Sequence, residues 1–126
     1  MNHKGFFFLV PCLLIGTLLH AQQKVMQTLR FKTSVECAIC EHSIERYLKR
    51  EPGVTYVHVD YHTKEATVRY YTDQMYPSLI LTDVANLGYD ADTVKADPDA
   101  YRRLPDCCKK GGMARLRAEQ AKHHSL

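Results

Sequence analysis

Apolar and polar residues alternate along three stretches of the chain, and this period of two predicts strands with one buried face. The stretches are residues 25–35, 54–61 and 66–71. In the first stretch, the apolar residues at odd positions are Val25, Leu29, Phe31 and Val35. The polar residues 62–65 separate the second and third stretches, so these two are expected to form a hairpin.

Two further stretches follow the helical period. Apolar side chains recur at i, i+4, i+7 and i+8 in a first amphipathic helix, which Pro52-Gly53 is expected to end. These side chains are Cys40, Ile44, Tyr47 and Leu48. A second helix is predicted after the start signals Asp73 and Pro77, and Gly88 stops it from the C′ position. Residues 89–94 are expected to supply a fourth strand.

The predicted elements follow the order strand, helix, strand, strand, helix, strand. This order indicates the α+β class and a ferredoxin-like βαββαβ sandwich, in which two helices cover one face of a four-stranded antiparallel sheet. In that topology the turn at Cys37, the hairpin at His62 and the turn at Gly88 and Tyr89 share one end of the sheet. This end of the sheet is therefore where a site is expected.

The N-terminal region has the pattern of a secretory signal peptide. It has a basic start at Lys4, an apolar run over residues 6–19 and a small residue, Ala21, at a suitable cleavage point. The run is shorter than the roughly 20 residues that a bilayer-spanning helix needs, so a cleaved segment fits better than an anchor. We therefore expect residues 1–21, including Cys12, to be removed. The protein would then be periplasmic or secreted, with no membrane span.

The remaining chain has room for one small domain and an extension. Residues 22–96 carry the predicted strands and the two amphipathic helices, and a weak helical stretch is expected over residues 113–122. Residues 97–126 form a basic extension, interrupted by proline and glycine, that is predicted to be flexible. The net charge of +3, with basic and acidic residues interspersed, is too small to indicate nucleic-acid binding.

Two thiols occur in Cys37-Ala38-Ile39-Cys40, where the first strand gives way to the first helix. A helix N-terminus lowers the pKa of a thiol, so this pair can be thiolate near neutral pH and can bind metal or exchange disulfides. Cys40 belongs to the apolar stripe of the helix and is expected to be partly shielded. Cys37 is expected to be the exposed member of the pair, which accepts or releases an ion first.

A second pair of thiols, Cys107 and Cys108, lies in the extension. An exported location permits disulfides, but a bond between adjacent cysteines is strained, which argues against structural stapling. Cys107 and Cys108 are therefore candidate auxiliary metal ligands. The alternative is a reactive, exposed tail pair with no fixed partner.

Three motifs occur at the junctions of the predicted elements: Ser34-Val35-Glu36-Cys37-Ala38-Ile39-Cys40, Pro52-Gly53-Val54 and Leu87-Gly88-Tyr89-Asp90-Ala91. In this order of elements they resemble those of the heavy-metal-associated domain, the module of copper chaperones, metal-transporting ATPase extensions and periplasmic mercury-binding proteins. The resemblance covers about residues 25–96. It implies that Cys37 and Cys40 hold one soft cation, that Tyr89 approaches the site, and that the function is binding without catalysis. The partner it implies is a metal-transporting membrane ATPase or another metal-binding domain.

The thiol pair favours Cu(I), which accepts low coordination and soft sulfur ligands. Hg(II) resembles Cu(I) in softness, whereas Zn(II) usually takes four ligands and tolerates carboxylate oxygen. Glu36 and the pair Cys107 and Cys108 therefore keep Zn(II) and Hg(II) open. His62 is placed to be a third ligand, although a solvated hairpin histidine is the plainer interpretation.

Two rival functions also fit the thiol pair. A thiol-disulfide oxidoreductase places such a pair at a helix start, but the usual Trp-Cys-Gly-Pro-Cys surroundings are absent and the chain has no tryptophan. The other rival is a structural or interaction domain whose cysteines are paired as disulfides.

Overall fold

The computed structural model describes residues 23–125, so the signal-peptide prediction and Cys12 lie outside the described residues. The first five elements are β1 (Met26–Lys32), α1 (Ala38–Leu48), β2 (Val54–Asp60), β3 (Glu65–Tyr71) and α2 (Pro77–Asn86). Three short or peripheral elements follow: α3 (Pro98–Arg103), the 3₁₀ turn η1 (Asp106–Cys108) and α4 (Gly112–His124). The predicted strands, hairpin and two helices of the first 86 residues are thus present.

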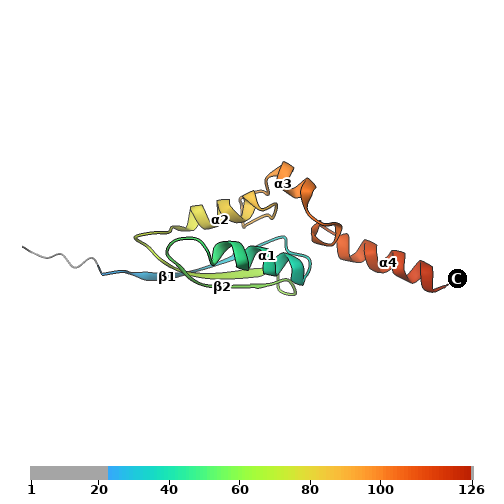
Figure 1. The fold of residues 1–126 in the computed structure, drawn as a ribbon, viewed down its shortest axis with the longest axis horizontal. Coiled ribbons are helices and arrows are strands. Elements are labelled where there is room, and N and C mark those ends of the chain that lie inside the picture. Colours follow the sequence, from blue (N-terminus) through green and yellow to red (C-terminus); the bar gives the residue numbers. More distant parts are fainter. Residues whose placement is uncertain (1–22, 126) are drawn as a thin grey trace, which may run out of the picture.

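The sheet has the antiparallel order β1-β3-β2, and α1 and α2 lie on the same side of it (Figure 1). Val68 in the central strand lies opposite Leu29 in β1 and Val57 in β2. Their side chains, with Ile44 of α1 and Ile80 of α2, belong to one core cluster or pack directly against it. The alternating and helical periods of the sequence therefore meet in a single core.

The edge strand β2 is covered by carboxylates from α1. Glu41 Oε1 accepts a hydrogen bond from the Tyr61 backbone N–H at 2.6 Å, and Glu45 Oε1 accepts one from the Val59 backbone N–H at 2.9 Å. Unpaired strand edges otherwise invite pairing with other chains. These contacts also fix α1, and with it the thiol pair at its N-terminus, against the sheet.

The predicted fourth strand does not form, and the sheet within residues 23–125 has three strands. Ala91 makes only isolated bridges, to Thr33 and to Val94. The Ala91 and Val94 backbones hydrogen-bond each other, and Asp92 adopts a left-handed conformation with φ 49°. The segment therefore turns back on itself instead of running along β1.

The predicted flexible extension is folded, which corrects the expectation drawn from its composition. Asp97 caps α3, because its side chain accepts a hydrogen bond from the Ala100 backbone N–H at 2.7 Å. The Asp97 backbone N–H donates to the Ala85 carbonyl at 2.8 Å, which ties α3 to the end of α2. Figure 1 shows α4 running away from the rest of the fold beyond η1. No helix within residues 23–125 is long and apolar enough to cross a bilayer.

Candidate metal centre

The N-terminus of α1 brings two thiols together. Cys37 is the N-cap residue in an extended conformation, and Cys40 lies in the first turn. The Sγ atoms of Cys37 and Cys40 are 3.3 Å apart. Cys40 continues inward along the helix stripe of Ile44 and Leu48, all of them fully buried. The C-x-x-C spacing thus delivers both sulfurs to one point, as the sequence predicted.

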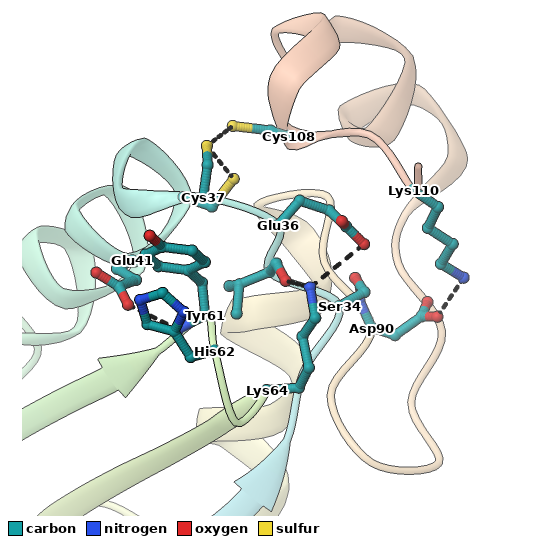
Figure 2. Close-up of polar contacts among 12 residues, drawn as sticks. Ser34, Glu36, Cys37, Glu41, Tyr61, His62, Lys64, Asp90, Cys108 and Lys110 are labelled. Atoms are coloured by element: carbon teal, nitrogen blue, oxygen red, sulfur yellow. Dashed lines mark hydrogen bonds and ion pairs between the residues drawn. The ribbon is translucent and has the colours of Figure 1, made fainter. Parts of the chain in front are cut away.

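The C-terminal segment, which comprises residues 97–125, brings a third thiol to the same point. Cys108 Sγ lies 3.8 Å from Cys37 Sγ, and Figure 2 shows Cys108 approaching Cys37 from the segment beyond α3. The ligand atoms of Cys37, Cys40 and Cys108 all lie within 4.8 Å of one another. We call these three residues the thiol cluster. Of the two auxiliary residues predicted, Cys108 belongs to it.

Cys107 has a different position from its neighbour. Its Sγ atom lies 3.9 Å from that of Cys108, and the residue is half-buried while Cys108 is buried. A 3₁₀ turn rotates successive residues by about a third of a turn, so adjacent side chains in η1 face different ways. Cys108 therefore points into the thiol cluster and Cys107 lies at its margin. All four cysteines of the described part of the chain are free thiols.

One ion pair holds the C-terminal segment against the domain. Lys110 Nζ lies 2.6 Å from Asp90 Oδ2, and the Lys110 backbone N–H donates to the Tyr101 hydroxyl at 3.1 Å. The Lys110 side chain holds the pKa of Asp90 below its usual range, with help from the Ala96 backbone N–H. Asp90 in turn raises the pKa of Lys110. Figure 2 shows this pair on the far side of Glu36 from Cys37.

The exposure predicted for Cys37 is wrong in degree. Cys37 is the less buried of the pair, but its exposed fraction is only 7% against 0% for Cys40. The reason is the C-terminal segment, whose Cys108 approaches the Cys37 sulfur. A sequence pattern within α1 cannot reveal a segment that returns over it.

The residues 31–90 match the family model of the heavy-metal-associated domain. The chain contains a heavy-metal-associated domain. The matched residues run from the last part of β1 to Asp90, and they include Cys37 and Cys40. Cys107 and Cys108 lie beyond them.

The relatives of this heavy-metal-associated domain include parts of copper ATPases. The chain is 35% identical over 71 residues to a copper-exporting P-type ATPase of Staphylococcus haemolyticus, covering 56% of this chain and 9% of the ATPase. It is 32% identical over 69 residues to human copper-transporting ATPase 2, covering 55% of this chain and 5% of that protein. The chain therefore matches only a small part of these relatives.

Solved structures show the same fold. The N-terminal domain of a potential copper-translocating P-type ATPase from Bacillus subtilis, in its Cu(I)-loaded state, superposes with a TM-score of 0.51 at 26% identity. The match covers 54% of this chain and 86% of that domain. Oxidised MerP from Ralstonia metallidurans gives a TM-score of 0.51 at 20% identity, covering 54% and 96% of the two chains. At that identity the second likeness shows the fold alone.

Tyr89 approaches the thiol cluster, as the resemblance to the family implied. It is fully buried, and burial raises the pKa of its hydroxyl, which the neighbouring Cys40 and Cys108 thiols raise further. Tyr89 also lines a cavity of about 340 Å³ between α1 and the C-terminal segment. The other residues that line this cavity include Arg46, Arg50 and Leu104. Tyr89 thus stands between this cavity and the sulfurs.

Glu36 does not join the sulfurs of the heavy-metal-associated domain. Its carboxylate lies 3.4 Å from Lys64 Nζ, which also donates to the Val35 carbonyl (Figure 2). Val35 itself is fully buried, as expected for an apolar position of the first alternating stretch. His62 is exposed and lies on the Tyr61 ring, outside the thiol cluster. The potential metal ligands that lie close together at this end of the fold are therefore the sulfur atoms of the thiol cluster.

The environment of the thiols sets their protonation in the metal-free protein. Burial opposes the ionisation of Cys37, but hydrogen bonds, chiefly from the Cys40 backbone and thiol and then from Cys107, hold the pKa of Cys37 below its ordinary value. Burial raises the pKa of Cys108, and the Cys40 thiol raises it further. Cys37 is thus favoured as thiolate, whereas a cation has to displace the Cys108 proton.

Proposed function

We propose that the chain binds one thiophilic metal ion through the Cys37 and Cys40 thiolates, with Cys108 as a third sulfur ligand. The observation that carries this proposal is the approach of all three sulfurs to within 4.8 Å of one another in a buried place. Thiolate, not thiol, is the ligand, and the lowered pKa of Cys37 favours that form. Buried sulfurs without a disulfide are suited to a cation that replaces their protons.

The donor set favours Cu(I). Soft thiolates select Cu(I), and three of them satisfy an ion that accepts low coordination. Zn(II) usually takes four ligands, and the carboxylate of Glu36, which precedes Cys37 in the sequence, is paired with Lys64 instead. The copper-related names of the relatives support the same ion. Hg(II) is the second candidate, because the thiol cluster offers sulfur only.

The proposed role is to bind the ion and to transfer or buffer it by ligand exchange. The acceptor or donor would be a metal-transporting membrane ATPase or another metal-binding domain, as the copper ATPase relatives suggest. Residues 1–21 would direct the protein out of the cytoplasm, so it would act in the periplasm or outside the cell. N-terminal sequencing of the protein recovered from the exported fraction tests this location, since a cleaved chain would begin near Gln22.

A metal titration tests the binding proposal. Fully reduced protein is titrated with Cu(I), Zn(II) and Hg(II) in competition and examined by native mass spectrometry. One Cu(I) or Hg(II) per chain is expected, and Cys37→Ser and Cys40→Ser should each lose tight binding. Variants that bind as tightly as the wild type would contradict the proposal. Turnover of a disulfide substrate that depends on Cys37, without tight metal binding, would favour the oxidoreductase instead.

A further inference from the structure

The four thiols that lie within residues 23–125 form a row from the protein surface to the core. The Sγ atoms of Cys107 and Cys108 are 3.9 Å apart, those of Cys108 and Cys37 are 3.8 Å apart, and those of Cys37 and Cys40 are 3.3 Å apart. The residues at the inner end are buried, and Cys107 alone among the four is half-buried.

The buried thiols have no direct access to a metal ion held by another molecule. Ligand exchange between two thiol carriers requires a sulfur of the receiver to contact the ion while the donor still holds it. The exposed fractions of Cys37, Cys108 and Cys40 are 7%, 2% and 0%, so a donor ligand cannot approach them past the C-terminal segment. A sulfur at the margin of the thiol cluster can make this first contact.

We propose that Cys107 is the exchange thiol through which the ion enters and leaves the buried thiol cluster. This inference rests on the proposed function. The Cys107 sulfur would bind the ion on the donor and release its proton to water as the donor's ligand takes one up. The Cys108 and Cys37 sulfurs, each one step further along the row, would then displace Cys107, and the proton that the Cys108 thiol gives up on binding the ion passes to Cys107. No oxidation state changes, and Cys107 is free again for the reverse transfer.

The turn η1 explains why two adjacent cysteines would have two roles. Cys108 faces inward and completes the equilibrium site, while Cys107 stays accessible. A residue that acts only during transfer should affect the rate of loading and not the final affinity. Cys107 and Cys108 are therefore expected to differ when each is replaced.

The test measures Cu(I) loading of the full-length reduced protein from its bicinchoninate complex by stopped-flow absorbance. Cys107→Ser is expected to take up Cu(I) about tenfold more slowly, which corresponds to a barrier higher by roughly 1.4 kcal/mol. Its equilibrium affinity for Cu(I) should stay within about twofold of wild type. Cys108→Ser should lose affinity instead. Asp106→Asn, an exposed neighbour on the same turn, controls for a general disturbance of η1 and should load at the wild-type rate.

A second readout uses iodoacetamide on the metal-loaded protein, followed by peptide mapping. Within residues 23–125, one alkylation per chain, on Cys107, is expected, because Cys37, Cys40 and Cys108 are protected, and peptide mapping separates it from any modification of Cys12. Two results would identify Cys107 as a permanent ligand and overturn the inference. One is a Cys107 that does not react with iodoacetamide, and the other is a loss of Cu(I) affinity in Cys107→Ser as large as that in Cys108→Ser. Unchanged loading by Cys107→Ser would also overturn it and leave the proposed function intact. A wild-type protein that takes up no Cu(I) would overturn both.

Discussion

Cys108 Sγ lies 3.8 Å from Cys37 Sγ although the two residues are 71 positions apart in the chain. Cys37 belongs to the heavy-metal-associated domain, and Cys108 lies in the segment that follows it. This contact converts a two-sulfur site into a buried three-sulfur cluster. It also covers the residue that a partner's thiol would otherwise approach.

Replacement of Cys108 should therefore change the coordination number. Cys108→Ser is expected to bind Hg(II) or Cu(I) through two sulfurs instead of three, which X-ray absorption at the metal edge would count. Loss of a residue that hydrogen-bonds a metal ligand lowers metal affinity by about 10- to 100-fold. Loss of a sulfur ligand itself should therefore lower the affinity by at least about tenfold. Cys107→Ser is the matched control and should keep three sulfurs. An unchanged sulfur count in Cys108→Ser would contradict the three-thiolate site.

Lys110 should control how often the C-terminal segment opens. Lys110→Ala removes the ion pair with Asp90 but keeps the hydrogen bond from the residue 110 backbone N–H to the Tyr101 hydroxyl. The Lys110 side chain is 58% exposed, so the stability loss should stay below about 1 kcal/mol. If this loss lowers the free energy of opening the C-terminal segment, the open form becomes more populated. Alkylation of Cys108 in the metal-free protein should then be about two- to fivefold faster.

Lys109→Ala provides the control for this experiment. Lys109 pairs with Asp106 within its own turn, at 3.6 Å, and makes no ion pair to the domain within residues 23–125. Its replacement should leave Cys108 alkylation at the wild-type rate. Equal acceleration by both variants would mean that general charge loss, not the pair with Asp90, opens the segment.

Asp83 in α2 should make stability depend on pH. Burial raises the pKa of its carboxyl and Glu51 raises it further, and Asp83 Oδ2 has no hydrogen-bond partner. A raised folded-state pKa means that the folded protein binds the proton more tightly, so stability falls as pH rises from the unfolded pKa near 3.9 through the folded pKa. At neutral pH the charged, unpaired oxygen is therefore destabilising.

Asp83→Asn removes that charge. The variant should be more stable than wild type by about 1 kcal/mol at pH 7, and the difference should shrink as pH falls towards the unfolded pKa, because wild-type Asp83 then takes up a proton. Urea unfolding at pH 4 and pH 7 measures both values. A pH-independent difference would show that packing, not ionisation, determines the effect.

Local patterns in the sequence were enough to predict much of the fold. The alternation around Phe31 and the helical stripe of Ile44 and Leu48 locate β1 and α1, because burial of one face is a local requirement. The C-x-x-C motif at the start of α1 predicted the meeting of Cys37 and Cys40, and the structure brings their sulfurs together. Both predictions depend on neighbours in the chain.

The remaining features depend on contacts between distant residues. The segment after α2 alternates like a strand, yet the left-handed Asp92 and the Ala91 to Val94 hydrogen bonds turn it back. The basic composition after residue 97 indicated flexibility, but it does not reveal the Lys110 to Asp90 pair that folds the segment back. That pair is one of the long-range contacts that hold Cys108 over Cys37, so spacing alone could not distinguish a ligand from a tail thiol.

Gly112 should be essential for placing Cys108. A Cβ atom at residue 112 would lie 1.7 Å from the Asp106 carbonyl oxygen, which is backbone and cannot rotate away. Asp106 begins η1, the turn that ends at Cys108, so Gly112→Ala must displace this turn. The variant is expected to lose Cu(I) affinity to about the level of Cys108→Ser, at least about tenfold, as measured by competition with bicinchoninate.

Gly111→Ala is the matched control for Gly112→Ala. Gly111 has φ 71°, so alanine there is strained by about 1 kcal/mol, but its Cβ would meet only the Arg115 side chain, at 3.5 Å. This variant should lose some stability and keep its Cu(I) affinity. If Gly112→Ala also kept its affinity and its three sulfurs, Cys108 would reach Cys37 independently of η1, and the C-terminal segment would not determine the geometry of the site.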